Sequence, residues 1–169
     1  MDARAPITDS HDPVEFRRIL GHVPTAVSVI TALTEDELPI GMVVGTFTSV
    51  SLDPPLVGFL PDKKSRTWPR IQAAGHFCAN ILTSDQAALC RQIASKPQDK
   101  FAGVDYRLST HRLPVIANAL ASVECRIHAV NDAGDHYFVL GQVLKMEAVH
   151  ASEPLLFFCG KYGGFADLN

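Results

Sequence analysis

The sequence predicts a mainly β protein, a split antiparallel β-barrel with a few peripheral helices. Most of its apolar segments are short, rich in β-branched residues and separated by turn residues. Strand-like and helix-like segments do not alternate as a Rossmann sheet requires, and the chain contains no GxGxxG motif. Many short strands with few helices favour a closed or partly closed barrel.

The N-terminal half contains one expected helix and three expected strands. Residues 1–11 are polar and are expected to form a flexible tail, and residues 12–169 a single domain. Asp12-Pro13 is typical of a helix start, and Gly21 of a helix end. Strands are expected over residues 25–34, 40–50 and 56–60.

The C-terminal half alternates further short elements with one long irregular segment, over residues 94–115. A segment of that length without regular structure predicts a functional loop or an excursion that covers a partner. A helix is expected over 65–74, ended by Gly75, and another is expected to be capped by Ser84-Asp85. Strands are expected over 76–82, 121–130, 137–149 and 154–159, with a turn at 131–135 joining the long pair.

Composition excludes several classes of function. The chain has 169 residues, of which 47% are hydrophobic and 20% charged, and its formal net charge is −3. These values fit one soluble globular domain, and the negative charge disfavours broad contact with nucleic acid. No apolar run is long enough for a membrane span, and the N-terminus lacks a signal peptide. We therefore expect a cytoplasmic protein that binds neither membrane nor nucleic acid.

The cysteine and histidine patterns point away from a metal site. Cys78, Cys90, Cys125 and Cys159 form no CxxC pair, and none lies near a histidine at zinc-ligand spacing. The interpretation that best fits these cysteines is that of small buried hydrophobes in a reducing compartment. No metal is expected.

Residues 39–67 contain the clearest indication of a ligand site. An apolar strand lined by small residues, within PIGMVVGTFTSV (39–50), would let a flat ring lie against the backbone. The cluster KKSRTWP (63–69) follows, with Ser65 as a plausible helix cap and free amides beyond it, an arrangement that suits a phosphate. An ordinary capped helix with solvated lysines would give the same pattern. Together the two segments predict a pocket for a planar phosphorylated cofactor.

Three further segments would have a functional role only if they lie beside such a pocket. Asp99-Lys100-Phe101 would add charge to the phosphate if its loop folds over the site, although a single loop lysine is usually just solvated. His136, where a turn becomes a strand, could stack on or hydrogen-bond an aromatic ligand, but a lone histidine is more often structural. The tail GKYGGF (160–165) places two aromatic residues in a flexible frame that could cap a ring.

Taken in order, these segments resemble the short-chain flavin reductases, the small components of two-component flavin monooxygenases. The resemblance rests on GMVVGTFTSVSLDPPLV (41–57), SRTW (65–68), FCANIL (77–82), DKFAGV (99–104), ALASVEC (119–125), GDHYFVLGQV (134–143) and PLLFFCGKYGGF (154–165). It covers nearly the whole chain from about Phe16 onward.

The resemblance implies a flavin-binding split barrel, usually a homodimer with its sites near the subunit interface. It implies hydride transfer from NADH or NADPH to FMN or FAD, with the reduced flavin released to a separate oxygenase. By position, Val43, Val44, Gly45 and Thr46 would face the flavin ring. Ser65 and Thr67, with Lys100, would hold the phosphate, and Pro61, Asp62 and Lys63 would border the site. Phe101 would be a further cofactor-binding residue. His136 and Tyr162 would be the catalytic residues, beside the nicotinamide and the open flavin face.

The chain departs from the family pattern within the ring-facing strand. After GM the family often has a Thr-Ala-Ser or Thr-Ala-Asn series, whereas this chain has Val43-Val44-Gly45. Two side chains that could hydrogen-bond the ring are thereby lost, although backbone groups could still serve. Hydride transfer needs no protein acid or nucleophile, only two stacked rings. A non-catalytic or electron-carrying flavoprotein and a haem- or pyridoxal-related split barrel are the alternatives.

Overall fold

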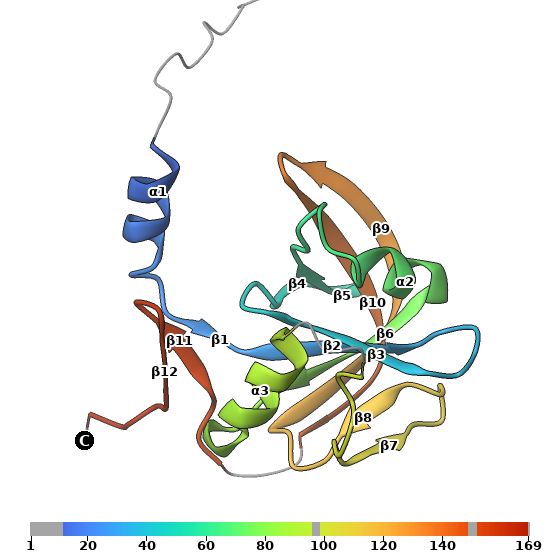
Figure 1. The fold of residues 1–169 in the computed structure, drawn as a ribbon. Helices are drawn as coiled ribbons and strands as arrows, with labels where there is room; N and C mark the ends of the chain where they lie inside the picture. The colour runs from blue at the N-terminus through green and yellow to red at the C-terminus, as the bar shows by residue number, and fades with distance from the viewer. Residues whose placement is uncertain (1–11, 96–98, 149–151, 169) are drawn as a thin grey trace, which may run out of the picture.

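The computed structural model describes residues 12–95, 99–148 and 152–168, so the predicted N-terminal tail lies outside the described residues. Its centre is a seven-stranded antiparallel sheet in the order β3-β2-β6-β9-β10-β5-β4 (Figure 1). These strands are β2 (Ser28–Leu33), β3 (Pro39–Val44), β4 (Thr48–Leu52), β5 (Pro55–Phe59), β6 (His76–Ile81), β9 (Ala121–Ala133) and β10 (His136–Ala148). The mainly β prediction is confirmed.

The remaining elements lie around this sheet. A small sheet contains β1 (Thr25–Ala26), β11 (Leu156–Phe158) and β12 (Lys161–Gly163), and a separate pair contains β7 (Tyr106–Leu108) and β8 (Pro114–Ile116). The helices are α1 (Pro13–Leu20), α2 (Trp68–Ala74) and α3 (Ala87–Ala94), with a short 3-10 turn, η1 (Ser84–Gln86), before α3.

The large sheet is rolled and is split along one seam. β3 and β4 are its two edges, yet only residues 45–47 connect them. At 3.8 Å between successive Cα atoms, this connection spans at most about 15 Å, so the two edges must lie close together. No strand pairing joins β3 to β4 among the described residues. The roll therefore resembles a barrel in its curvature but leaves the outer edge of β3 without a strand neighbour.

Two apolar clusters lie on opposite faces of β2 and β3, because successive side chains of a strand point to opposite sides. The first cluster contains Ile30, Phe59, Trp68 and Phe77 and packs against α2. The second contains Val27, Val29, Leu82, Cys90, Ile93 and Phe101 and packs against α3. Helix α2 is thus held on the sheet by its side chains in the first cluster, and helix α3 by its side chains in the second.

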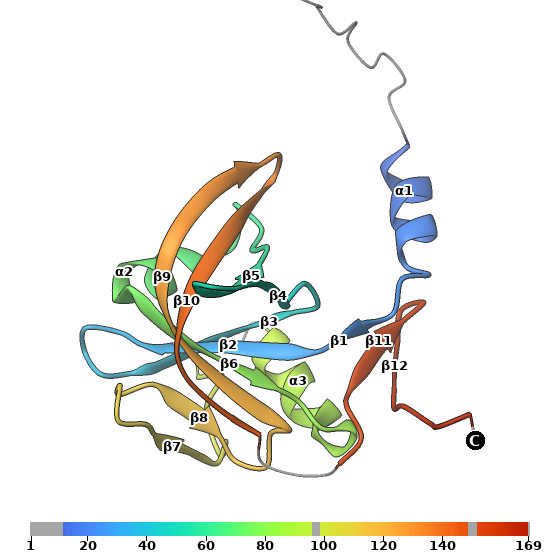
Figure 2. The same cartoon turned by 180° about the vertical axis from the view of Figure 1, so that it is seen from behind.

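Helix α1 has the predicted start and end but not a buried face. Asp12 Oδ1 accepts a hydrogen bond from Val14 N at 2.9 Å, and Gly21 follows the last turn. None of its residues is buried, and it stands beside the small sheet, away from the main body (Figures 1 and 2). About half or more of the surface of each of its apolar residues is exposed, and these residues are Val14, Phe16, Ile19 and Leu20.

Several predicted boundaries were wrong for local reasons. The strand expected over residues 40–50 is two strands, divided at the seam. The helix expected from Ser65 begins at Trp68, because Ser65 forms the turn before it. Thr83 rather than Ser84 caps the following helical segment, in a reciprocal capping box with Gln86.

The long hairpin and the C-terminal tail also differ from the prediction. β9 and β10 continue to a two-residue turn at Gly134-Asp135, where the backbone of Gly134 has a φ of 70° that favours glycine. The tail expected to be irregular contains β12, which pairs with β11. The segment 94–115, expected to be irregular, contains β7.

The cysteines follow the prediction in three of four positions. Cys78, Cys90 and Cys125 are buried, whereas Cys159 is exposed in the turn between β11 and β12. Burial raises the pKa of Cys78 and of Cys125 to about 12, so both stay as thiols at neutral pH.

Candidate functional site

A cavity of about 1040 Å³ lies between β3, the segment before α2, the C-terminal end of α3 and the loop that follows it. These segments are far apart in the sequence but surround one space. Five predicted cofactor-binding residues line it: Val43, Ser65, Thr67, Lys100 and Phe101. The predicted association of the small-residue strand with the phosphate cluster and the lysine loop is therefore present as one cavity.

The loop that carries Lys100 is fixed from both sides. Gln92 Nε2, on α3, donates hydrogen bonds to Lys100 O at 3.1 Å and to Ala102 O at 2.8 Å. On the opposite side Phe101 packs on Gly41 of β3, where a Cβ atom would lie only 3.1 Å from the phenylalanine ring. Gly41 thus lets the loop approach the strand closely and places Lys100 over the cavity.

Four cations among the described residues line the same cavity and make it a basic site. They are Lys64, Arg66, Arg70 and Lys100, and we call them the basic cluster. Within the part of the chain that the structure describes, Asp99 is the one carboxylate lining the cavity, and it accepts a hydrogen bond from Phe101 N at 3.0 Å. Among the described residues no ion pair involves the basic cluster. Burial lowers the pKa of Lys100, because desolvation disfavours the charged ammonium.

Sequence reasoning missed part of this cluster. Arg70 follows Thr67 by three residues, so the first turn of α2 carries its side chain back to the same face. Lys64 and Arg66 were seen within the cluster KKSRTWP but were not assigned to the site, whereas Lys63 was. The i, i+3 spacing of Thr67 and Arg70 was the signal that could have found Arg70.

The predicted free amides at the start of α2 are not free. Ser65 Oγ accepts hydrogen bonds from Thr67 N at 3.2 Å and from Trp68 N at 3.1 Å. Ser65 therefore shapes the turn and holds the two amides that were expected to face a phosphate. The side chains of the basic cluster and the Thr67 hydroxyl are among the donors that line the cavity.

The other predicted binding residues form a second group beside the tip of the β9–β10 hairpin. Tyr137 N donates to Pro61 O at 3.0 Å, and Asp62 forms an isolated bridge with His136. Lys63 is turned away from the basic cluster, because its ammonium pairs with Asp132 and lies 5.1 Å from the centre of the Tyr137 ring. Pro61, Asp62 and His136 thus lie together, and the Lys63 side chain extends toward the hairpin rather than toward the basic cluster.

The ring-facing strand offers backbone more than side chains. The Val44 side chain is buried in the first apolar cluster, so only its backbone could meet a ligand. Gly45 and Thr46 are exposed at the seam, and Thr46 Oγ1 accepts a hydrogen bond from Leu60 N at 2.9 Å. Because β3 is an edge strand, its outer backbone groups are available along this stretch.

The structure does not bring the two predicted catalytic residues together within one chain. His136 Nδ1 lies 2.7 Å from Asp135 Oδ1 at the hairpin tip. Tyr162, on β12, hydrogen-bonds the Cys90 thiol through its hydroxyl, with an O–S distance of 3.2 Å. The hairpin tip and β12 lie well apart in both views (Figures 1 and 2). Tyr162 therefore packs on α3 rather than beside His136.

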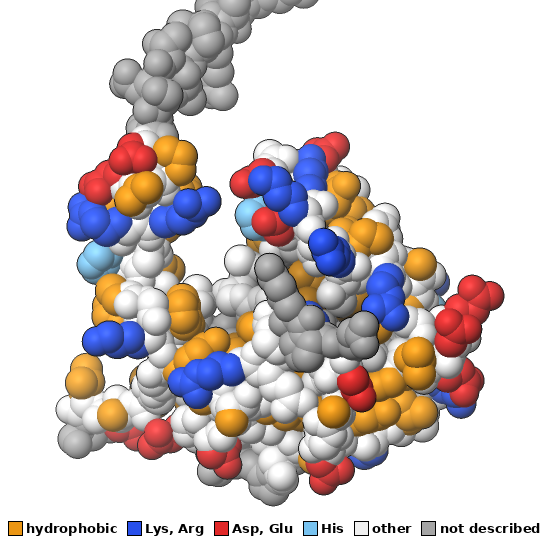
Figure 3. Space-filling model, viewed as in Figure 1, with side chains coloured by type: hydrophobic (Ala, Val, Ile, Leu, Met, Phe, Trp, Pro, Cys, Tyr) orange, Lys and Arg blue, Asp and Glu red, His pale blue; other side chains and the backbone are white. Residues whose placement is uncertain are grey.

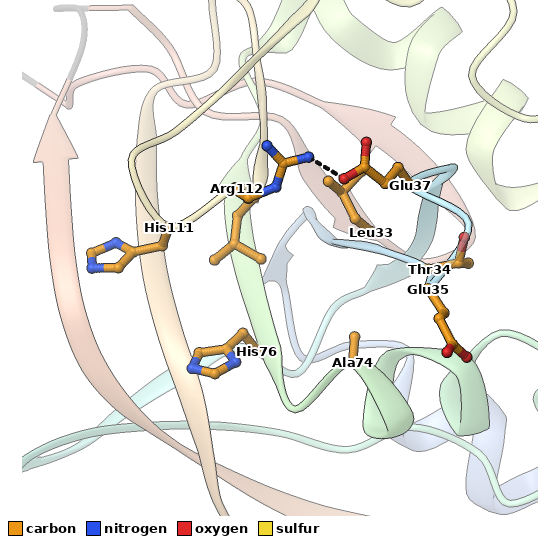
Figure 4. A pocket seen from close by; sticks show the side chains of 9 residues that line it. Leu33, Thr34, Glu35, Glu37, Ala74, His76, His111 and Arg112 are labelled. Carbon is orange, nitrogen blue, oxygen red and sulfur yellow. Dashed lines mark hydrogen bonds and ion pairs between the residues drawn. The ribbon is translucent and has the colours of Figure 1, made fainter.

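A second hollow, of about 200 Å³, contains none of the predicted site residues (Figure 4). Glu37 and Arg112 pair across it with a separation of 2.5 Å, and His76 and His111 also line it. His111 Nδ1 lies 2.7 Å from Glu124 Oε2, which also accepts a hydrogen bond from Ser109 at 2.8 Å. These contacts hold the β7–β8 excursion on the sheet and have a structural role.

The described residues contain neither a candidate metal site nor a candidate membrane-spanning helix. No set of three or more His, Cys, Asp or Glu side chains is grouped so that it could hold a metal ion. No helix in the described ranges has the length and apolar character needed to span a membrane.

Comparison with known proteins gives a consistent result. Residues 20–166 match the family model described as the flavin reductase like domain. A flavin reductase from Pseudomonas putida is 49% identical over 155 residues, covering 92% of this chain and 91% of that protein. The flavin-dependent monooxygenase reductase subunit HsaB from Mycobacterium tuberculosis is 43% identical over 155 residues, covering 90% and 82% of the two chains.

A solved structure is similar over almost the whole chain. It is the NADH:FAD oxidoreductase SgcE6 from Streptomyces globisporus in complex with NAD and FAD fragments. The sequences are 36% identical, the TM-score is 0.89, and the match covers 98% of this chain and 100% of that chain.

Proposed function

The chain belongs to the flavin reductase-like domain family, and we propose that it is an NAD(P)H:flavin oxidoreductase that transfers hydride to FMN or FAD. The observation that carries this proposal is the cavity in which the basic cluster adjoins the open edge of β3. The basic cluster suits a phosphorylated ligand. The open edge of β3 suits a flat ring that lies against the main chain. The names of the relatives, flavin reductase and NADH:FAD oxidoreductase, agree with this chemistry.

The residues of the cavity fit a flavin. Arg66, Arg70 and Lys100 would pair with its phosphate, supported by the Thr67 hydroxyl. The backbone from Val43 to Thr46 would meet the ring, and Phe101 and Val43 would give it an apolar surface. The bound flavin would supply the hydride acceptor, and a nicotinamide nucleotide the donor. The protein's part is to hold both rings in register and to limit the access of water.

Steady-state kinetics test the proposal directly. NADH and NADPH oxidation would be followed with FMN, FAD and riboflavin as acceptors. We expect turnover that depends on added flavin. A protein that binds flavin but oxidises neither nucleotide would instead be the non-catalytic flavoprotein, and a Soret band in the purified protein would indicate a haem protein.

His136 is proposed to contact the nicotinamide. It lies beside Pro61 and Asp62 at the border of the site, and 39% of its side chain is exposed. We expect His136→Ala to raise the KM for NADH several-fold while the flavin Kd changes less than twofold, since a single contact of this kind contributes about 1 kcal/mol. His128→Ala, an exposed histidine on the neighbouring strand β9, is the control. Equal effects of the two variants would remove His136 from the site.

We further propose that two copies associate through α1 and the small sheet. Phe16, Ile19 and Leu20 form one exposed apolar face, and an isolated helix of eight residues is not stable in water. Phe157 and Phe158 on β11 are also exposed close to it. Figure 3 shows open space between α1 and the main body on this face, where a second copy could be seated.

Light scattering after gel filtration tests this association. The parent protein is expected to have twice its chain mass, and Ile19→Asp is expected to lower the mass to that of one chain at micromolar concentration. Arg17→Asp, a charge change on the same short helix, is the matched control. A parent protein that runs as a single chain contradicts the proposal.

The expected partner of the protein is inferred from the family resemblance and from the names of the relatives. The name of HsaB, reductase subunit of a flavin-dependent monooxygenase, supports a separate oxygenase as the recipient of reduced flavin. A cytoplasmic location remains a prediction from the sequence.

A further inference from the structure

At Gly45, the space that a side chain would need is occupied by Thr25 from a different strand, β1. It stands at the seam, exposed, at the end of the strand edge that the proposed function assigns to the flavin ring. A Cβ atom on Gly45 would lie 2.8 Å from Thr25 Oγ1 and 3.4 Å from Thr25 Cβ. The backbone of Gly45 is not in the left-handed region, so glycine is needed here for space rather than for conformation.

Thr25 is held in this place by its own strand. It is half-buried on β1, and its register partner on β11 is Phe157. Phe157 is in turn the register partner of Tyr162 on β12. Directly paired residues of antiparallel strands point to the same face of a sheet, so these three side chains form one row. The row leads from the seam to the aromatic residue that was expected to lie at the open flavin face.

We propose that Thr25 is a flavin-binding residue whose hydroxyl, placed against Gly45, hydrogen-bonds the polar edge of the flavin ring. This inference rests on the proposed function and assigns to β1 the polar contact that Val43 and Gly45 lack. A threonine hydroxyl both donates and accepts, so it can pair with a ring carbonyl or with the ring N–H. Gly45 and Thr25 then act as one unit, in which the glycine admits the hydroxyl.

Flavin affinity, measured by fluorescence quenching on the flavin-free apoprotein, tests this unit. Thr25→Val keeps the shape and removes the hydroxyl, and we expect it to weaken FMN and riboflavin by the same factor, about fivefold, the loss of one hydrogen bond. Thr25→Ser is expected to keep the parent affinity. Because the ring rather than the phosphate is involved, the ratio of the FMN and riboflavin Kd values should not change.

Gly45→Ala is a second, independent test, since its Cβ would displace the Thr25 hydroxyl. It is expected to weaken both flavins as Thr25→Val does, with an unchanged melting temperature of the apoprotein in either variant. Parent-like affinity of Thr25→Val for both flavins overturns the inference and leaves the proposed function intact. A parent protein that binds neither FMN nor riboflavin overturns the proposed function itself. If Thr25→Val does not fold, the Gly45→Ala result alone decides.

Discussion

Replacing Gly141 by alanine is expected to destabilise the protein by about 3 kcal/mol, because the new methyl group has no space in a closely packed core. Gly141 is buried in β10, and a Cβ atom there would lie 2.5 Å from Phe77 Cζ and 3.0 Å from Cys125 Cβ. Phe77 cannot move aside easily, since it is fully buried and packs edge-on against Phe59 with ring centres 5.2 Å apart. Chemical denaturation of the two proteins measures the difference.

Gly163→Ala provides the matched control for this substitution. Gly163 also lies in a strand, β12, but a Cβ atom there would meet nothing within 4 Å. Its free energy of unfolding should stay within about 0.5 kcal/mol of the parent value. If Gly141→Ala were as stable as this control, the packing assigned to the first apolar cluster would be wrong.

Lys100→Ala is expected to raise the Kd for FMN about tenfold and to leave the Kd for riboflavin unchanged, since a charge-assisted hydrogen bond contributes about 1.5–3 kcal/mol. Lys100 lines the cavity with Arg66 and Arg70, and its loop is fixed by Gln92. Riboflavin lacks the phosphate, so it reports the ring contacts alone. Lys145→Ala, which removes a lysine paired with Glu147 on β10, should change neither Kd.

The same lysine predicts a pH dependence with a definite sign. Burial lowers the pKa of Lys100 below its ordinary value of 10.5 in the free protein. The protonated ammonium is the form that pairs with phosphate, so FMN affinity is complete below this lowered pKa and falls as the pH rises through it. The ratio of the FMN and riboflavin Kd values should therefore begin to rise at a lower pH than it would for a lysine with the ordinary pKa. In Lys100→Ala this rise should be absent or displaced to higher pH.

Local sequence signals predicted the regular elements well where those elements are self-contained. Asp12-Pro13 and Gly21 bound α1, and Gly75 ends α2, because caps and left-handed positions are set by neighbouring residues. The division of the strand at residues 45–47 was missed, since an apolar run carries no sign of where a sheet must turn to close. Such a turn is held by contacts with segments distant in the sequence, such as the hydrogen bond that Leu60 N donates to Thr46 Oγ1.

The candidate site was predicted in outline for a similar reason. Ser65 and Thr67 could be recognised from local chemistry and Lys100 from the family resemblance, and the structure gathers all three around one cavity. Lys63 and Lys64 are adjacent in the sequence, and only the fold decides that Lys63 turns to Asp132 while Lys64 lines the cavity. The close approach of Thr25 to Gly45 is a tertiary contact, and the positions of the two residues in the sequence give no sign of it.

A crystal structure of the protein with FMN tests the central assignment most directly. The phosphate should lie among Arg66, Arg70 and Lys100, within hydrogen-bond distance of the Thr67 hydroxyl, and the ring should lie along the backbone of residues 43–46. If the phosphate lies outside this cavity, or if the basic cluster contacts a different part of the molecule, the site has been wrongly placed.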